Sequence, residues 1–412
     1  MHKLLIILLG ISIFSCQNAV SKKCKKQTVK DNAIQNIDLE CFKEYGRKKQ
    51  AHKFFSFLHK DRKFNGNILI YTNGELYREC FGWADIPEKT PLSNNSQFQI
   101  ASMSKPFAAV SIMQLVSAGK LKLTDTINQY LESWPYPGIT IDQLLSHTSG
   151  IPEYMNLADK YWNDTLGYLN NHDVECLFTE TKFPVYFRPG AKHDYCNSNF
   201  VLLANIIEKV TGMKYPEYLS KNIFQPLGMQ STFVFTSTDS LMKQEVKGHY
   251  GLGHYLKDHF LNGSYGDKNI WSTTGDLLRF YKGIFNPKFL NAKQRNLMFQ
   301  TIVEKARGTS QYARGWRKKI IDKDTWIFHT GWWKGFRTNL FFHSKKEQCF
   351  IVLSNRLKAG TFQSDMVADF FSKGGYRTAY AYYFDSSQID LKSFDSFRRE
   401  KENQLRIRRD SN

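Results

Sequence analysis

Alternation of apolar and polar residues, typical of strands, occurs near both ends of the central part of the chain. Asn73-Gly74 separates the first two such segments, and this dipeptide is typical of a tight hairpin turn. The last two segments flank the polar residues 344–347 and form a second predicted hairpin. We therefore expect a mostly antiparallel sheet that is built from both ends of the chain. The predicted strands are 66–71, 75–83, 325–328, 338–342 and 349–353.

Helical spacing dominates the middle of the chain. Apolar residues recur at helical intervals over 108–116 and over 200–210, and Gly119 and Gly212 follow as stop signals. Between about 130 and 240 the pattern indicates helices and long loops, with little sign of strands. The predicted fold class is α+β, with an antiparallel sheet flanked by helices and an inserted all-helical lobe. A cleft between sheet and lobe is the expected place for a site.

The N-terminus has the features of an export signal. A short basic start precedes the apolar run 4–14, which is too short to cross a bilayer as a mature helix. The run ends at Ser15-Cys16, which resembles a bacterial lipoprotein signal with cleavage before Cys16 and a lipid on its sulfur. The alternative is an ordinary secretory signal with an incidental cysteine. Both interpretations predict export, and the first predicts a membrane-anchored lipoprotein of a bacterial cell envelope, facing the periplasm or the surface.

Composition divides the chain into four parts. The seven cysteines include Cys16, and the even number that remains permits disulfides without requiring them. The oligomeric state stays open. The expected parts are a signal peptide at 1–15, a tether at 16–45, a globular domain at 46–375 with the helical lobe at about 130–240, and an aromatic and basic tail at 376–412.

The chain has 57 Lys and Arg against 38 Asp and Glu, a net charge of +19 that suits an anionic partner. For an exported chain, such partners are lipid headgroups or cell-wall polymer, and the basic run 21–26 lies just after the predicted lipid site. The sequence contains no nucleic-acid-binding motif, so we expect no nucleic-acid partner. No metal-ligand spacing occurs among the cysteines and the 11 histidines, so we expect neither metal nor cofactor.

The segment 97–107 carries the candidate chemistry. Ser102 and Lys105 stand three residues apart at the start of a predicted helix, and this spacing brings two side chains to the same face. A serine hydroxyl is a weak nucleophile until a base takes its proton, and a desolvated lysine can be that base. Alone, the pattern occurs by chance in many proteins and more often marks a capped helix with a solvated lysine than a catalytic pair.

Two further motifs follow, Tyr195-Cys196-Asn197 and His329-Thr330-Gly331. The three motifs stand in the order found in serine β-lactamases and penicillin-recognising enzymes, and the chain resembles that family. The resemblance covers about residues 50 to 356 and implies a β-lactamase/transpeptidase-like fold. It is specific to the branch of class C β-lactamases, D-alanyl-D-alanine carboxypeptidases and related esterases. Further similar stretches are 144–152, 187–190, 226–229 and 266–277.

The resemblance implies a catalytic role for three residues. Ser102 would attack a carbonyl and become acylated, and Lys105 is the nearest base. Tyr195 would relay the proton to the leaving group and later help to activate water, a role that requires cationic neighbours. Taken singly, Tyr195 is also compatible with a packing role.

The resemblance also implies how the substrate is held. Asn197 would bind Lys105 and the substrate amide, and the backbone N–H groups of Ser102 and Trp332 would bind the oxyanion. Gly331 would let the strand edge approach the substrate closely. The motif residues His329 and Thr330 complete the predicted substrate-binding set: Asn197, His329, Thr330, Gly331 and Trp332.

The sequence departs from the family pattern in ways that concern the substrate. His329 stands where many β-lactamases have lysine, so a substrate carboxylate would be held less firmly at neutral pH. Two tryptophans follow the motif and would narrow the cleft, while Lys334 or Arg337 would supply the missing positive charge. Efficient β-lactam turnover is therefore in question. We interpret two further residues of the family-like stretches as structural. His147 would organise its loop through hydrogen bonds, and Cys196 would be a packed residue rather than a reactive thiol.

The sequence thus predicts an exported, membrane-anchored serine hydrolase that acts through a Ser102 acyl-enzyme. Its substrate would be an amide or ester, such as a cell-wall peptide, a β-lactam-like molecule or a small ester. The alternative is a penicillin- or peptidoglycan-binding protein that uses the same cleft without turnover. The intact set of Ser102, Lys105 and Tyr195 favours the enzyme.

Overall fold

The computed structural model describes residues 34–372 and 376, apart from 36, 165–166, 237, 240–243, 252, 257, 308–309, 358–361 and 363. The predicted signal peptide, residues 16–33 of the predicted tether with Cys16 and its predicted lipid, and all of the predicted tail except Tyr376 lie outside the described residues. Within the described part, no helix combines the length and the apolar character that a membrane span needs.

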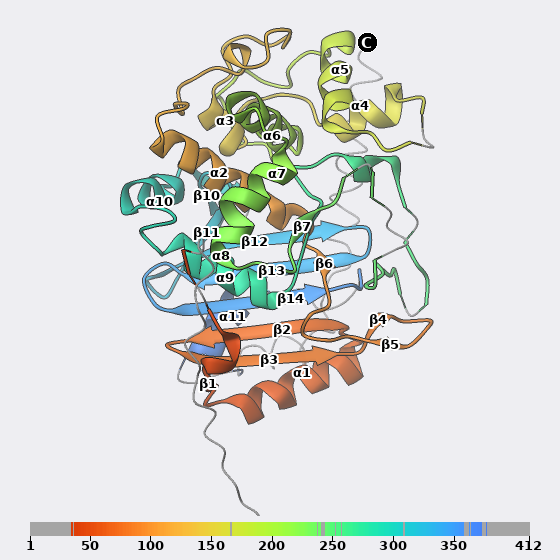
Figure 1. Cartoon of the computed structure of the whole chain (residues 1–412), viewed down its shortest axis with the longest axis vertical. Helices are drawn as coiled ribbons and strands as arrows, with labels where there is room; N and C mark the ends of the chain where they lie inside the picture. The colour runs from red at the N-terminus through yellow and green to blue at the C-terminus, as the bar shows by residue number, and fades with distance from the viewer. Residues whose placement is uncertain are drawn as a thin grey trace, which may run out of the picture.

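A large sheet runs through the middle of the molecule (Figure 1). Among the described residues, nine strands pair in the order β1-β3-β2-β14-β13-β12-β11-β10-β9, and only β1 with β3 is parallel. The early strand β2 pairs with the late strand β14, which confirms a mostly antiparallel sheet built from both chain ends. The bounds are β1 Lys43–Glu44, β2 Gly66–Thr72, β3 Glu75–Phe81, β9 Val303–Arg307, β10 Ser310–Tyr312, β11 Arg317–Ile321, β12 Asp324–Trp333, β13 Phe336–His343 and β14 Gln348–Ser354.

Both predicted hairpins form. Between β2 and β3, Asn73 and Gly74 have φ angles of 45° and 84°, the left-handed conformation that a two-residue hairpin turn requires and that these two residue types adopt readily. β13 and β14 form the second hairpin around residues 344–347. Short strands form two smaller sheets, β4 Trp83–Asp85 with β5 Thr90–Pro91, and β6 Phe98–Gln99 with β8 Ile270–Ser272 and β7 Phe233–Val234.

The sheet separates two apolar cores. Along β14, Ile351 and Leu353 belong to one core while Phe350 and Val352 belong to the other, because successive side chains of a strand point to opposite faces. We call the core that contains Phe350 the rear core, and α1 and α11 cover it. We call the core that contains Ile351 the front core, and α9 and α2 pack against it (Figure 1). These helices are α1 Lys48–Arg62, α2 Lys105–Ser117, α9 Thr274–Ile284 and α11 Ser364–Phe371.

α2 lies between the sheet and the helical lobe (Figure 1). Its residues 105–113 are all buried, which fits a helix with apolar residues on every side. The predicted helix over 200–210 is the centre of α6, which ends at Gly212 with φ 69°. The remaining helices are α3 Ile141–Leu145, α4 Tyr154–Tyr161, α5 Asn171–Thr181, α6 Ser198–Thr211, α7 Tyr215–Leu219, α8 Gln225–Leu227 and α10 Ala292–Phe299.

Candidate active site

Ser102 lies at the junction of sheet and lobe. It sits in a 3-10 turn, Ala101–Ser104, that runs directly into α2. Ala101 has a φ of 51°, an unusual conformation for a residue with a Cβ atom, and this sharp turn presents Ser102 at the start of the helix. Lys105 Nζ lies 3.1 Å from Ser102 Oγ, the convergence that the three-residue spacing predicts.

Lys105 is completely buried, and three oxygen atoms surround its ammonium group. Besides Ser102, these are Asn197 Oδ1 at 2.8 Å and the backbone oxygen of Asp267 at 2.9 Å. As an ammonium ion, Lys105 donates to all three, and as a neutral amine it can accept from the Ser102 hydroxyl while still donating to the other two. The contacts therefore suit both protonation states that a general base must pass through.

Glu153, the residue before α4, orients Asn197. Glu153 Oε2 accepts from the Asn197 backbone N–H at 2.9 Å and from Asn197 Nδ2 at 3.0 Å. Because the amide nitrogen faces the carboxylate, the amide oxygen must face Lys105. The buried carboxylate of Glu153 thus holds Asn197, the last residue of the Tyr-x-Asn motif, in contact with Lys105.

The ring of Tyr195 lies between positively charged groups. Lys105 Nζ lies 5.0 Å from the ring centroid, and the Arg317 guanidinium carbon lies 5.1 Å from it. Both distances are in the range of cation–π contacts. The cationic neighbours that a proton-relay tyrosine requires are therefore present.

His147 stacks against Tyr195, with ring centroids 4.2 Å apart. Its Nδ1 accepts the backbone N–H of Cys196 and the side-chain N–H of Asn199, both at 3.1 Å. Nδ1 therefore carries no proton, and Nε2–H donates to the Tyr312 hydroxyl at 3.0 Å. This contact joins the loop after α3 to strand β10, so it ties the helical lobe to the sheet directly beside Tyr195.

Tyr312 continues the chain of hydrogen bonds to His329. The Tyr312 hydroxyl lies 3.5 Å from His329 Nε2, and His329 Nδ1 lies 2.9 Å from the backbone oxygen of Thr330. Since a backbone oxygen only accepts, Nδ1 carries the proton of a neutral His329. Burial, assisted by nearby positive charges, lowers the pKa of both His147 and His329 well below the usual value.

Gly331 lets β12 reach the Ser102 turn. A Cβ atom at Gly331 would lie 2.1 Å from the backbone oxygen of Ile100 and 2.2 Å from Thr338 Oγ1, so no side chain fits there. Thr338 in turn donates to the Ile100 oxygen at 2.7 Å. The contact brings Ser102 and Trp332, whose N–H groups the resemblance assigns to the oxyanion, onto adjoining elements.

A profile of the family described as Beta-lactamase matches residues 56–369. The chain belongs to the Beta-lactamase family. It is 32% identical over 329 residues to Penicillin-binding protein 4* of Bacillus subtilis (strain 168), covering 75% of this chain and 72% of that protein.

Solved structures of the family share the fold. A penicillin-binding protein from Bacillus halodurans is 26% identical with a TM-score of 0.65, covering 73% of this chain and 94% of that one. A class C β-lactamase has a TM-score of 0.64 at 19% identity, covering 77% of this chain and 92% of that one, and this match shows the fold alone. The protein is therefore a serine hydrolase of the Beta-lactamase family with a β-lactamase/transpeptidase fold.

In this active site, Arg317 places a positive charge near His329, a role that the sequence did not suggest for it. Arg317, at the start of β11, lies over the rings of Tyr195 and Tyr312, at 5.1 and 5.6 Å. Its charge contributes to the lowered pKa of His329. The sequence suggested Lys334 or Arg337 for this charge, and that suggestion stays a prediction.

Lys334 lies in the turn between β12 and β13, and Arg337 is the second residue of β13, opposite Trp332. Arg337 Nε donates to the backbone oxygen of Leu357 at 2.9 Å, and its guanidinium carbon lies 5.8 Å from the ring of Trp332. Lys334 is half-buried, and burial lowers its pKa. Trp332 is 51% exposed, so it forms part of the rim rather than the floor.

Cys196 is packed rather than reactive. It is buried between Tyr195 and Asn197, with Sγ 3.5 Å from the backbone oxygen of Ile151 and 3.4 Å from that of Pro152. Burial raises the pKa of its thiol, so the reactive thiolate is disfavoured. This environment agrees with the structural interpretation of the motif's central residue.

Sequence reasoning missed several residues of the site: Glu153, Asp267, Tyr312 and Arg317. Glu153 directly follows the family-like stretch 144–152, and Asp267 lies within 266–277, so position alone was a weak signal for these two. Tyr312 and Arg317 carried no signal, because only the pairing of β10, β11 and β12 brings them to the site.

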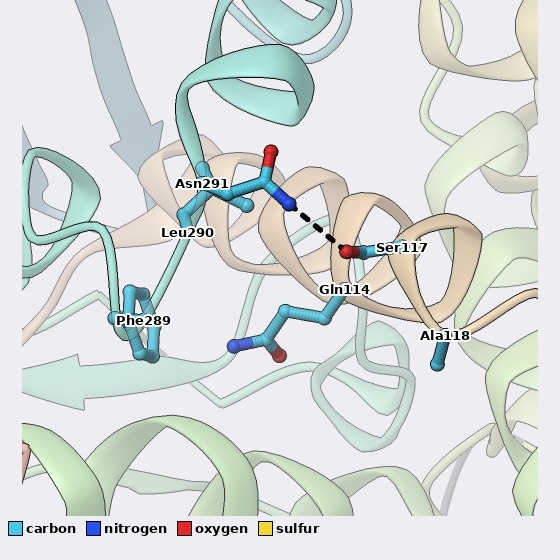
Figure 2. Close-up of a pocket in the computed structure, with 6 residues that line it drawn as sticks. All are labelled: Gln114, Ser117, Ala118, Phe289, Leu290 and Asn291. Atoms are coloured by element: carbon cyan, nitrogen blue, oxygen red, sulfur yellow. Dashed lines mark hydrogen bonds between the residues drawn. The ribbon is translucent and has the colours of Figure 1, made fainter.

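Two hollows lie away from Ser102. One, of about 220 Å³, lies between the end of α2 and the segment before α10, where Asn291 donates to Ser117 Oγ at 3.2 Å (Figure 2). The other, of about 490 Å³, is lined by residues of β12, β14 and α11. Among the described residues, no cluster of His, Cys, Asp and Glu has the arrangement of a metal site.

Proposed function

We propose that the protein is an exported hydrolase that cleaves an amide or ester through a covalent acyl group on Ser102. The 3.1 Å contact between Lys105 Nζ and Ser102 Oγ carries this proposal, because a fully buried lysine held by Asn197 and Asp267 is placed to take the serine proton. No residue of the site needs a metal or cofactor for this chemistry.

The proposed reaction has two halves. In the first, the Ser102 proton moves to Lys105, Oγ attacks the substrate carbonyl, and backbone N–H groups of Ser102 and Trp332 stabilise the oxyanion. Lys105 returns the proton through Tyr195 to the leaving amine or alcohol, and the acyl-enzyme remains. In the second, Tyr195 accepts a proton from water, the resulting hydroxide attacks the ester, and Ser102 leaves with that proton.

The charge around the site supports a substrate with a carboxylate near the scissile bond. His329 is neutral, so it offers no positive charge, whereas the guanidinium of Arg317 lies 5.1 Å from the Tyr195 ring and presents N–H donors in a fixed fork. Cell-wall peptides end in such a carboxylate. The similarity to Penicillin-binding protein 4* supports the same substrate class and makes a penicillin a suitable acylating probe.

We further propose that Cys16 is lipidated and anchors the protein to a bacterial membrane. The support is the short apolar run that ends at Ser15-Cys16. The Cys16→Ser variant should move from the membrane fraction to the soluble exported fraction. Membrane retention of that variant would contradict the anchor.

Intact-mass measurement tests the enzymatic proposal. The protein is incubated with a fluorophosphonate, a penicillin and a short activated ester, and the mass is followed over time. A hydrolase should gain the phosphonyl group of the first reagent and the acyl groups of the other two, and should lose the ester-derived acyl group within the time course, with release of the acid. An ester adduct that forms and persists would instead identify a binding protein without turnover.

A further inference from the structure

Tyr195 is held in place by its ring and its backbone, and not by its hydroxyl. None of the hydrogen bonds between described residues involves that hydroxyl, although the proposed proton relay needs it at a defined position. The half-buried ring stacks on His147, with Lys105 and Arg317 at 5.0 and 5.1 Å from its centroid. Ring contacts restrict a side chain less sharply than a hydrogen bond does, so the position of the phenol depends on how firmly His147 is held.

His147 binds the backbone on both sides of Tyr195. Its backbone oxygen accepts the N–H of Asp194 at 2.9 Å, and its Nδ1 accepts the N–H of Cys196 at 3.1 Å. His147 also has a φ of 57°, a conformation that a residue with a Cβ atom keeps only where the surrounding contacts impose it. One residue thus contacts the ring of Tyr195 and both of its neighbours, so the place of His147 determines the place of Tyr195.

Tyr312, the last residue of β10, fixes His147 relative to the sheet. It is completely buried, and its hydroxyl is the one partner of His147 Nε2 among the described residues, at 3.0 Å. The two rings lie edge to face, with centroids 5.0 Å apart and planes at 71°. On its other side the Tyr312 hydroxyl lies 3.5 Å from His329 Nε2, a long contact, so the bond to His147 provides most of the restraint.

These contacts form one directed chain between the lobe and β12. The Cys196 N–H donates to His147, His147 Nε2–H donates to the Tyr312 hydroxyl, and that hydroxyl faces the free lone pair of His329 Nε2. The other nitrogen of His329 donates to the backbone oxygen of Thr330. The chain therefore begins at the Tyr-x-Asn motif and ends at the His-Thr-Gly motif, and the hydroxyl of Tyr312 is the group that joins its two halves.

We propose that Tyr312 is a positioning residue for the reaction: its hydroxyl fixes His147 to the sheet, and through His147 it holds the ring of Tyr195 where the proton relay needs it. The inference rests on the proposed function of Tyr195. Without the Tyr312 hydroxyl, the loop that carries His147 loses this hydrogen bond to the sheet, and Tyr195 moves with that loop. The lobe and the sheet each carry part of the site, so this contact sets their relative position beside the relay.

Removal of the Tyr312 hydroxyl tests the proposal. Tyr312→Phe keeps the buried ring and loses the hydrogen bond to His147. Acylation by an activated ester, measured over a range of ester concentrations, separates the rate constant of acylation from the binding constant of the ester. The rate constant should fall about tenfold, because a displaced relay group slows proton transfer, while the binding constant should stay within about twofold of the wild-type value.

The same substitution in a Tyr195→Phe background distinguishes positioning of Tyr195 from a general structural role. Once the Tyr195 hydroxyl is gone, the Tyr312 hydroxyl has no relay group left to position. The further loss of acylation rate should then be less than about twofold. A tenfold loss in both backgrounds would overturn the inference, because a general defect slows the reaction whether or not the relay hydroxyl is present. An unchanged rate in the single variant would overturn it as well.

Tyr71 on β2 provides a matched control. It is 1% exposed, and its hydroxyl accepts from Lys282 Nζ at 2.7 Å and donates to Glu347 at 2.5 Å. Two strands, β14 and β13, separate β2 from β12 in the sheet. Tyr71→Phe therefore removes a buried, hydrogen-bonded hydroxyl away from the relay. It should lower the free energy of unfolding, as Tyr312→Phe does, and leave the acylation rate unchanged in both backgrounds.

His147→Asn breaks the same contact from the side of the lobe, and it serves if Tyr312→Phe does not fold. Asparagine adopts a positive φ readily, and its oxygen can accept the Cys196 N–H, but its shorter side chain does not reach Tyr312. Acylation should fall at least tenfold, again with less than about twofold further loss in the Tyr195→Phe background. A wild-type rate in His147→Asn would overturn the inference.

Failure of the proposed function gives a different result. A wild-type protein that forms no ester adduct would refute the proposed function, and the inference would fall with it. A wild-type protein that is acylated, together with a Tyr312→Phe variant that keeps its rate, would overturn the inference alone.

Discussion

The rear core and the cleft lie on opposite sides of the central sheet and bury very different side chains. The rear face packs aromatic rings, as where Phe350 lies 5.3 Å from Phe362 and 5.1 Å from Phe370, centroid to centroid. On the opposite side, where the turn before α2 meets β12, the buried groups include two lysines and two histidines, each with specific hydrogen-bond partners. The rear core stabilises the fold without directional contacts, and the cleft fixes the positions of polar atoms.

The difference follows from the energetics of burial. A fully buried phenylalanine contributes about 1.5–3 kcal/mol wherever it packs well, so exact placement matters little. A buried polar group is unfavourable unless its partners are in place, so each contact restricts geometry. Substitutions in the rear core should therefore lower the free energy of unfolding and leave the acylation rate nearly unchanged. Substitutions of polar residues in the cleft should lower the acylation rate more than the stability.

The largest effect is expected on the acylation rate, from substitution of Lys105 and Tyr195. Lys105→Ala and Tyr195→Phe should each reduce the acylation rate by about 10²–10⁴-fold, and the double variant should be little worse than the poorer single one, because both residues serve one proton relay. Pre-steady-state acylation by an activated ester measures this. Losses that multiply, or full activity of Tyr195→Phe, would remove Tyr195 from the relay.

A change of similar size in free energy is expected at the rear core, but in stability. Phe350→Ala should lower the free energy of unfolding by about 3–5 kcal/mol, while Phe350→Leu, which keeps much of the volume, should lower it far less. Denaturant unfolding gives both values. The acylation rate of each folded variant should stay within about twofold of wild type at low temperature. A large loss of rate in Phe350→Leu would show that the two faces are coupled.

The neutral histidines of the cleft make stability depend on pH. The pKa of His329 is depressed in the folded protein, so below about pH 6.5 the unfolded chain binds a proton that the folded chain does not. Stability is then lost as the pH falls, by up to about 1.4 kcal/mol per pH unit for one such histidine.

Comparison of two variants isolates that contribution. His329→Asn should flatten the fall in unfolding free energy between pH 6.5 and 5, whereas His172→Asn, at an exposed position of α5, should not. Equal slopes for wild type and His329→Asn would show that His329 is not held neutral.

The smallest effect is expected at the rim of the cleft. Trp332 is 51% exposed, so Trp332→Ala should change the free energy of unfolding by no more than about 0.5 kcal/mol. Its backbone N–H is retained, so acylation by a small ester should persist within about tenfold. Trp83→Ala, which removes the indole of another exposed tryptophan, is the control for the loss of an exposed aromatic side chain. Complete loss of acylation in Trp332→Ala would mean that the indole itself belongs to the reacting centre.

The sequence predicted those features that depend on local spacing. The Asn73-Gly74 turn, the helix around 200–210 and the approach of Lys105 to Ser102 each follow from residues a few positions apart. The sheet between the chain ends followed from the strand pattern at both ends. The family-like motifs indicated which distant segments would converge.

Features that depend on strand register and lobe packing could not be predicted. Arg317 reaches Tyr195 because β11 pairs beside β12, with Arg317 opposite Phe328. Tyr312 lies between two histidines because β10 follows in the same sheet. In the sequence Lys268 has no feature that marks it as buried, and the fold buries it by packing Tyr154 of α4 and Trp333 of β12 against it.

The central claim is that Ser102 becomes acylated, and peptide mapping of a fluorophosphonate adduct tests it most directly. Ser104 is the matched control, because it lies two residues away and is buried, accepting the backbone N–H of Ile270 at 3.1 Å. The adduct should lie on Ser102 in the wild-type protein and in Ser104→Ala, and Ser102→Ala should carry none. An adduct on Ser104, or normal labelling of Ser102→Ala, would contradict the account.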